Sequence, residues 1–173
     1  MNHKTECPGC GLILPDKNLA PHEYYNASGE CWELKGELTA YNMTSGDPTF
    51  IHQHCVDAYG AQHTGNQTKA ITTLFALVGL CLAVEYHFTG KQVQHAHMNF
   101  AKPAAGWPSL KPPHKMNELT ILDVLNCEPG KPRDRMIKEW ATYIWNSWRA
   151  HHDTIRALCK QHIKDERIQS LLR

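Results

Sequence analysis

Residues 50–65 read FIHQHCVDAYGAQHTG and place three histidines, His52, His54 and His63, within fewer than four helical turns. His52 and His63 are eleven residues apart, which is close to three turns at about 3.6 residues each, so on a helix both point the same way. Apolar residues recur at helical spacing on that same side: Cys55, Val56 and Tyr59. The pattern therefore predicts a helix whose histidines face the interior of the protein.

A pair of cysteines near the start of the chain has the spacing of metal ligands. Cys7-Pro8-Gly9-Cys10 is followed by Gly11, and these glycines let backbone amides approach the thiolates. Two unrelated surface cysteines or a redox pair are the alternatives. A thioredoxin-type pair follows a strand and opens a helix, whereas here a short apolar run follows and ends at Pro15. The spacing therefore favours a loop of the zinc-knuckle kind.

A third cysteine, Cys31, is expected in the first turn of the next helix. Ser28 is a good N-cap for a helix that runs to about Asn42. The positive end of the helix dipole favours a thiolate in this first turn. We therefore expect Cys31 to be a third metal ligand, with an ordinary buried cysteine as the alternative.

Three thiolates and one imidazole complete the tetrahedral coordination of Zn²⁺, which makes such a site closed and structural. His63 is the expected fourth ligand, because it ends its helix and can meet a loop. His52 is the second choice. His22 is the third, since it lies between Cys10 and Cys31 and would make the N-terminal loop self-contained.

The remaining sequence predicts an all-α fold, a bundle of about five to six helices in one domain, residues 1–173. Further helices are expected over 67–87, 91–100 and 121–127, and a long last helix over 134–158. The predicted parts are a metal-binding loop segment (1–29), a helical body (30–100 and 118–160), a proline-rich crossover (101–117) and a charged, solvated tail after Cys159. The helix over 67–87 is apolar nearly all round, so it should be central.

Charge and apolar runs exclude several classes of protein. The chain has 18 basic and 17 acidic residues and a net charge of +1, which is not the signature of a nucleic-acid surface. The longest apolar run, Ala70 to Val84, falls short of the ~20 residues of a membrane span. The polar N-terminus has no apolar segment of the signal-peptide type. We therefore expect a reduced, cytoplasmic protein.

A second, reactive site is conceivable if His52, Asp57 and either His151 or His152 converge between two helices. However, Asp57 lies roughly 140° around the helix from His52 at about 100° per residue, which weakens a direct pairing. The alternatives are an Asp57 that faces solvent or binds N–H groups, and a last-helix histidine that is an ordinary hydrogen-bonded core residue.

Several short motifs together resemble a family of mostly bacterial proteins known as a domain of unknown function. They are CPGCG (7–11), SGECW (28–32), VDAYGAQHTG (56–65), GLCLAVE (79–85), WPSLKPP (107–113), LTILDVL (119–125) and EWATYIWNSWRAHHDTIR (139–156). The resemblance implies the cysteine triplet, a histidine matching His52 and the pair Gln62-His63, but no activity. The chain departs from the family at Phe75, where a histidine is expected, and at Thr64, where proline is usual.

Three functions are compatible with these residues. The first is a zinc-stabilised binding or scaffold protein, with a homodimer formed through the tryptophan-rich last helix. The second is a small metalloenzyme, a hydrolase or lyase, that uses an inward histidine cluster. The third is thiol redox chemistry at Cys7 and Cys10.

Overall fold

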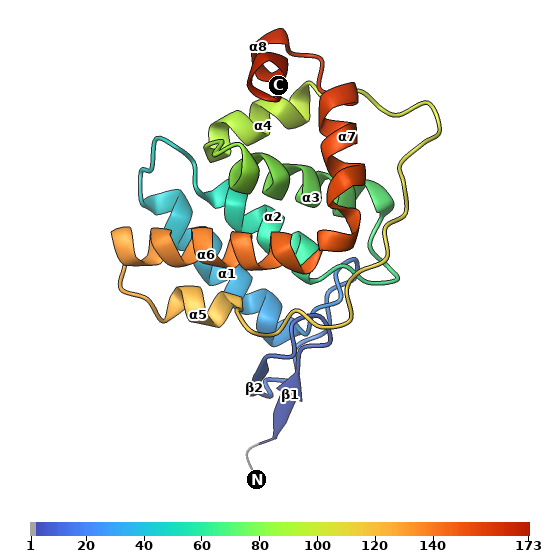
Figure 1. The fold of residues 1–173 in the computed structure, drawn as a ribbon. Helices are drawn as coiled ribbons and strands as arrows, with labels where there is room; N and C mark the ends of the chain where they lie inside the picture. The colour runs from blue at the N-terminus through green and yellow to red at the C-terminus, as the bar shows by residue number, and fades with distance from the viewer. Residues whose placement is uncertain (1–2) are drawn as a thin grey trace.

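The computed structural model describes residues 3–173, which form eight α-helices and one two-stranded sheet (Figure 1). The elements are β1 (Lys4–Glu6), β2 (Ile13–Pro15), α1 (Gly29–Thr44), α2 (His52–Gln62), α3 (Ala70–Glu85), α4 (Gly90–Met98), α5 (Ile121–Leu125), α6 (Lys131–Ser147), the 3₁₀ turn η1 (Arg149–His151), α7 (His152–His162) and α8 (Glu166–Leu171). The expectation of a mainly helical body is confirmed. The helix count is higher than five to six, because the C-terminal region is more divided than its sequence pattern indicates.

The core forms where α2 and α3 pack against each other and α6 crosses both (Figure 1). Helix α3 is central, as its nearly uniform apolar sequence predicts, and Leu74, Leu77 and Leu80 are fully buried. No helix in the described range 3–173 has the length and apolar character needed to cross a membrane.

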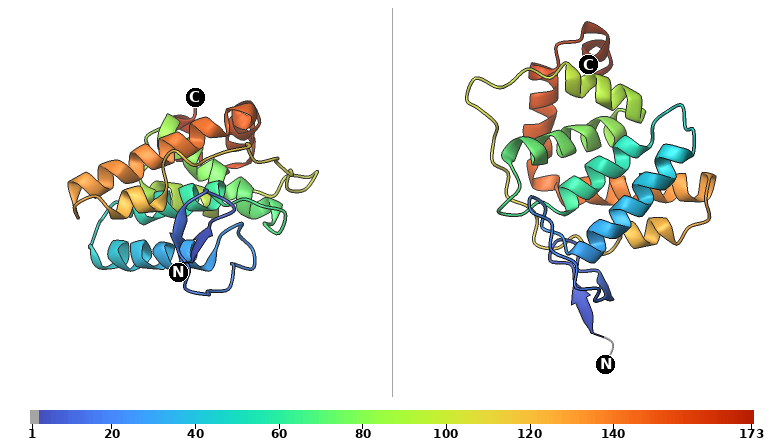
Figure 2. Two further views of the ribbon diagram at one scale, coloured as in Figure 1. Left: turned by 90° about the horizontal axis from the view of Figure 1, so that it is seen from below. Right: turned by 180° about the vertical axis from the view of Figure 1, so that it is seen from behind.

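The N-terminal segment lies at one end of the helical body, beside the first turn of α1 (Figures 1 and 2). Strands β1 and β2 pair antiparallel, with Thr5 opposite Leu14. The turn between them carries the two cysteines: Cys7 N–H donates to the Leu12 carbonyl at 2.8 Å, and Gly11 N–H donates to the Cys7 carbonyl at 2.8 Å. Gly11 has φ of +70°, a conformation that favours glycine.

The predicted long last helix is wrong, because it is two helices with a sharp change of direction. Helix α6 ends at Ser147, the turn η1 follows, and α7 begins at His152 and leads away from the end of α6 in a different direction (Figure 1). The bend lets α7 bury Ile155 and Cys159 while it packs against α3. A straight continuation of α6 would carry these apolar side chains past α3 and into solvent.

The C-terminal tail is also more ordered than predicted. Asp165 caps helix α8 by accepting from the N–H groups of Arg167 and Ile168. Ile168 and Leu172 are buried, while the charged residues Lys164, Glu166 and Arg167 before them are exposed. The helical body therefore extends beyond residue 160, because two apolar side chains fold the charged segment back onto α4.

The proline-rich crossover, residues 101–117, runs along the outside of the body as an extended chain (Figure 1). Trp107 fixes it in place: its ring lies 5.7 Å from that of Phe75 and 6.2 Å from that of Phe100, measured between ring centroids. Phe75, which replaces the histidine that the resemblance implies, is therefore part of an aromatic cluster beneath the crossover.

Three tryptophans in α6 and just after its end point into the interior of this chain. Trp140, Trp145 and Trp148 are each no more than 1% exposed. They form the seam between α6 and the helices beneath it. A homodimer contact through the tryptophan-rich last helix, as the sequence predicts, would need surface residues of that helix, because these three rings are buried.

Candidate metal centre

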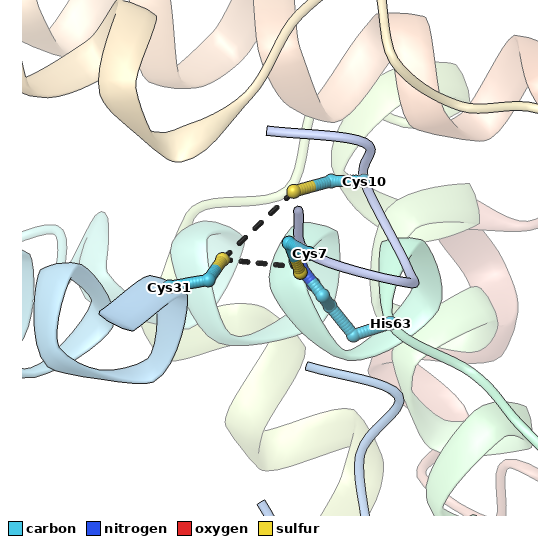
Figure 3. Close-up of side chains that lie close together, drawn as sticks. All are labelled: Cys7, Cys10, Cys31 and His63. Carbon is cyan, nitrogen blue, oxygen red and sulfur yellow. Dashed lines mark hydrogen bonds between the residues drawn. The ribbon is translucent and has the colours of Figure 1, made fainter. Parts of the chain in front are cut away.

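Four potential metal ligands from three separate segments meet at one buried point (Figure 3). Cys7 and Cys10 come from the turn between β1 and β2, Cys31 from the first turn of α1, and His63 from the residue after α2. Their ligand atoms all lie within 4.8 Å of one another, and each residue is at most 1% exposed. The structure thus brings together the four residues that the sequence analysis selects.

The distances exclude a disulfide and fit free thiols around one centre. Cys10 Sγ lies 3.8 Å from Cys31 Sγ, far beyond a disulfide bond of about 2.05 Å. Cys31 Sγ lies 3.4 Å from His63 Nε2. One metal ion can therefore reach all four ligand atoms.

His63 is oriented by the helix that precedes it. Its Nδ1 lies 2.9 Å from the Tyr59 carbonyl, and its ring stacks on the Tyr59 ring with 3.9 Å between centroids. An Nδ1–H that donates to this carbonyl leaves the Nε2 lone pair directed at the sulfur atoms, which is the usual support for a metal-binding histidine.

Cys31 is positioned by the cap of α1. The Ser28 hydroxyl accepts from Cys31 N–H at 3.2 Å, as expected for this N-cap. Cys31 Sγ also accepts from the Tyr59 hydroxyl at 3.5 Å. The helix N-terminus and this hydroxyl both stabilise negative charge on the sulfur.

The thiols of the cluster differ in pKa. The pKa of Cys7 is lowered, chiefly by its hydrogen bond with Cys10 and then by that with Cys31. The pKa of Cys10 is raised, first by Cys31 and then by Cys7. Without a cation, one thiolate at most is stable in this dry site, because each further negative charge meets the first at close range.

Gly9 allows the hairpin turn to approach α2. A Cβ added at Gly9 would lie 2.3 Å from the Asn26 carbonyl oxygen and 2.7 Å from a ring carbon of His63. Asn26 N–H in turn donates to the His63 carbonyl at 2.8 Å.

The supporting residues Tyr59 and Asn26 were not selected from the sequence. The sequence does contain a signal for Tyr59: it lies four residues before His63, and residues at this spacing are neighbours on a helix.

The two alternative fourth ligands lie elsewhere. His22 Nδ1 accepts from the N–H groups of Tyr24 and Tyr25, and its ring packs on Trp32 with 4.0 Å between centroids. His52 Nδ1 lies 3.4 Å from Asn42 Nδ2. His52 begins α2, whereas His63 follows its end. The two residues lie on the same face of the helix but at opposite ends of it.

The weaker catalytic candidates each have a local partner. Asp57 is 2% exposed and accepts from Gln53 Nε2 at 2.9 Å, so it binds an N–H group and does not face solvent. His152 stacks on Trp145 with 3.8 Å between centroids, and its Nε2 lies 2.8 Å from the Trp145 carbonyl. Over residues 3–173, the only cluster of three or more potential ligands is the Cys7, Cys10, Cys31 and His63 group.

Fold and site together define a mainly helical protein with a buried cluster of three cysteines and one histidine that can bind a metal. The chain belongs to the family described as "Family of unknown function (DUF5946)", whose model matches residues 5–149. This match contains the whole metal centre and ends before α7. No curated protein and no solved structure matches the chain.

Proposed function

We propose that Cys7, Cys10, Cys31 and His63 bind one zinc ion and that this ion is structural. The zinc-binding turn would be of the zinc-knuckle kind, formed by the β1–β2 hairpin. The ion would join the hairpin to α1 and α2, and the protein would act as a binding or scaffold module in a reducing, cytoplasmic compartment.

The separations between ligand atoms carry this proposal. A tetrahedral ion with Zn–S bonds of about 2.3 Å and Zn–N bonds of about 2.05 Å places two sulfurs about 3.8 Å apart, and a sulfur and a nitrogen about 3.6 Å apart. The corresponding distances in the protein are 3.8 Å between Cys10 and Cys31 and 3.4 Å between Cys31 and His63. The site therefore has the size of a zinc coordination shell.

The electrostatics of the site support a divalent cation. Three thiols and one imidazole are buried together, and no lysine or arginine is among the groups that shift the pKa of Cys7 or of Cys10. A bound zinc ion deprotonates coordinating thiols, which removes the mutual repulsion that otherwise limits their ionisation. Four protein ligands also leave no coordination position for water, which favours a structural role.

Elemental analysis of the purified full-length protein tests the proposal. We expect one zinc per chain, and we expect Cys7→Ser to lose the metal and to melt at a lower temperature. Cys127→Ser is the matched control, since Cys127 is half-buried, lies outside the ligand cluster and donates a hydrogen bond from Sγ to the Asp123 carbonyl. A Cys7→Ser protein with full zinc content and unchanged melting temperature would contradict the assignment.

The same samples separate the alternative functions. Cobalt substitution should give an intense sulfur-to-metal charge-transfer band and the visible spectrum of a tetrahedral ion. A second metal per chain, or a metal whose spectrum changes with added anions, would favour a hydrolase or lyase instead. Reversible disulfide formation by Cys7 and Cys10 without loss of metal or fold would favour thiol redox chemistry.

A further inference from the structure

A second candidate site is a cavity of about 340 Å³ at the other end of α2 from His63. It lies between the loop before α2, the end of α3, the start of α4 and one face of α6. No residue of the metal centre lines it. Small-molecule sites in proteins are commonly cavities of this size with an apolar wall and a few polar groups.

His54 is the buried polar group of this cavity. It is 6% exposed, and its Nδ1 has no hydrogen-bond partner among the residues that the structure describes. Burial lowers the pKa of His54 to about 4, so the ring is neutral at pH 7. A buried ring nitrogen without a partner is unfavourable, and a ligand that hydrogen-bonds to it would remove this cost.

Two opposite charges line the cavity from α6. Asp134 and Lys138 are one helical turn apart, and within residues 3–173 neither forms an ion pair. The carboxylate of Asp47 also lines the cavity, but it already accepts from the N–H of Ile51 at 2.7 Å and from Thr49. Asp134 and Lys138 are therefore the charges available to a ligand.

The cavity also has an apolar wall. It is formed by Ile51, Ala83, Val84 and Phe88, together with Ala141 of α6 itself. This wall suits a small hydrocarbon side chain. Asp134 would repel a ligand that carries only a negative charge, and Lys138 would repel one that carries only a positive charge. A zwitterion can form an ion pair with each of them.

We propose that this cavity binds a zwitterion of the apolar amino-acid type. Its ammonium group pairs with Asp134, its carboxylate pairs with Lys138, its side chain packs on the apolar wall, and His54 hydrogen-bonds to the polar end. This site is independent of the metal centre, so either assignment can fail without the other.

Calorimetric titration of the metal-loaded full-length protein tests this, with L-valine, L-leucine and L-phenylalanine as separate probes. We expect at least one of them to bind and to raise the melting temperature. The amide of that amino acid lacks the carboxylate and its N-acetyl derivative lacks the ammonium, so each should bind at least tenfold more weakly. If no amino acid binds, or if either derivative binds as tightly, the proposal is wrong.

Matched variants on one helix locate the site. Asp134→Asn and Lys138→Gln should each weaken binding at least tenfold. Glu139→Gln and Lys131→Gln make the same charge changes on α6 outside the cavity, so they should leave affinity within twofold. Circular dichroism and melting confirm that all four variants fold. Binding that Asp134→Asn and Lys138→Gln leave unchanged would overturn the assignment.

Discussion

At the scale of single residues, the contact of Asp57 with Gly79 sets how closely α2 and α3 approach. A Cβ added at Gly79 would lie 2.0 Å from Asp57 Oδ2, so any larger residue there must displace the buried Asp57 carboxylate. Asp57 accepts from Gln53 through its other oxygen, while Oδ2 has no hydrogen-bond partner among residues 3–173. The close contact accounts for a glycine at position 79 of α3, opposite Asp57 of α2.

Gly79→Ala should destabilise the protein by about 2–3 kcal/mol, because the added methyl group clashes with the buried Asp57 carboxylate. Gly36→Ala is the matched control: Gly36 is exposed in α1 with no atom within 4 Å of an added Cβ. That variant should gain about 0.5–1 kcal/mol from helix propensity. Urea denaturation measures both, and equal effects of the two substitutions would contradict the role given to Gly79.

Burial raises the pKa of Asp57, and the hydrogen bond from Gln53 only partly opposes this. The folded protein therefore holds a proton that the unfolded chain releases above about pH 4. The stability linked to this group falls as the pH rises from about 4 through the raised pKa.

Asp57→Asn removes this linkage while keeping the shape and the acceptor oxygen. The stability of Asp57→Asn relative to the natural chain should therefore increase as the pH rises from 4 to 7. Denaturant melts of both proteins over this range measure the difference, in which the contributions of other titrating groups cancel. A difference that is constant with pH would show that Asp57 is ionised in the folded protein.

The four residues of the candidate metal centre could be selected from the sequence because their chemistry is local. Cys7 and Cys10 share a turn, Cys31 follows an N-cap, and His63 ends a helix, and each of these is visible in a few adjacent residues. The sequence could not distinguish His63 from His52 by helical face alone. Position along the helix decides between them, and this depends on where the hairpin packs.

At the scale of elements, the break between α6 and α7 is the feature that could not be predicted from the sequence. The apolar stripe continues through Trp148, and neither proline nor glycine occurs between Ser147 and His152. The bend has a tertiary cause, since it places α7 on α3. Helix periodicity identified the helical residues correctly, but it cannot report a change of direction without a helix-breaking residue.

Glu85 joins α3 to both helices at this break. Its carboxylate accepts from Trp145 Nε1 at 3.0 Å in α6 and from Arg156 at 2.7 Å in α7. Glu85→Gln should destabilise the protein by about 1–2 kcal/mol, because a half-buried charge-assisted pair is weakened.

Asp153→Asn is the control for this prediction. Asp153 also pairs with Arg156, but its side chain is fully exposed, so its loss should change stability by less than about 0.5 kcal/mol. Thermal melts of the two variants give the comparison. Similar losses from both would mean that Glu85 does not act as the link between the three helices.

At the scale of the whole molecule, the candidate metal centre lies where the N-terminal segment meets the helical body. The N-terminal segment leaves large apolar side chains in solvent, since Ile13 in the hairpin is 59% exposed and Leu19 after it is 41% exposed. The large core of α2, α3 and α6 lies apart from it (Figure 2). Loss of the ion should therefore act unevenly over the chain.

Removal of metal by a strong chelator should release residues 3–28 first. Limited proteolysis should then cut within this segment, while most of the helical circular dichroism is retained. Re-addition of zinc should restore protection, because in such segments metal-binding energy is folding energy. If chelation melts all helices together, or if the segment stays protected, the ion does not act as a local attachment.

The wide spacing of the ligands along the chain also affects the order of assembly. Cys7, Cys10 and Cys31 are synthesised before His63, which becomes available only with the end of α2. Until then, a nascent chain carries three thiols without their imidazole partner, and these thiols are accessible to oxidants and to competing metal ions. The three thiols therefore become protected from oxidants and competing metal ions only when α2 docks.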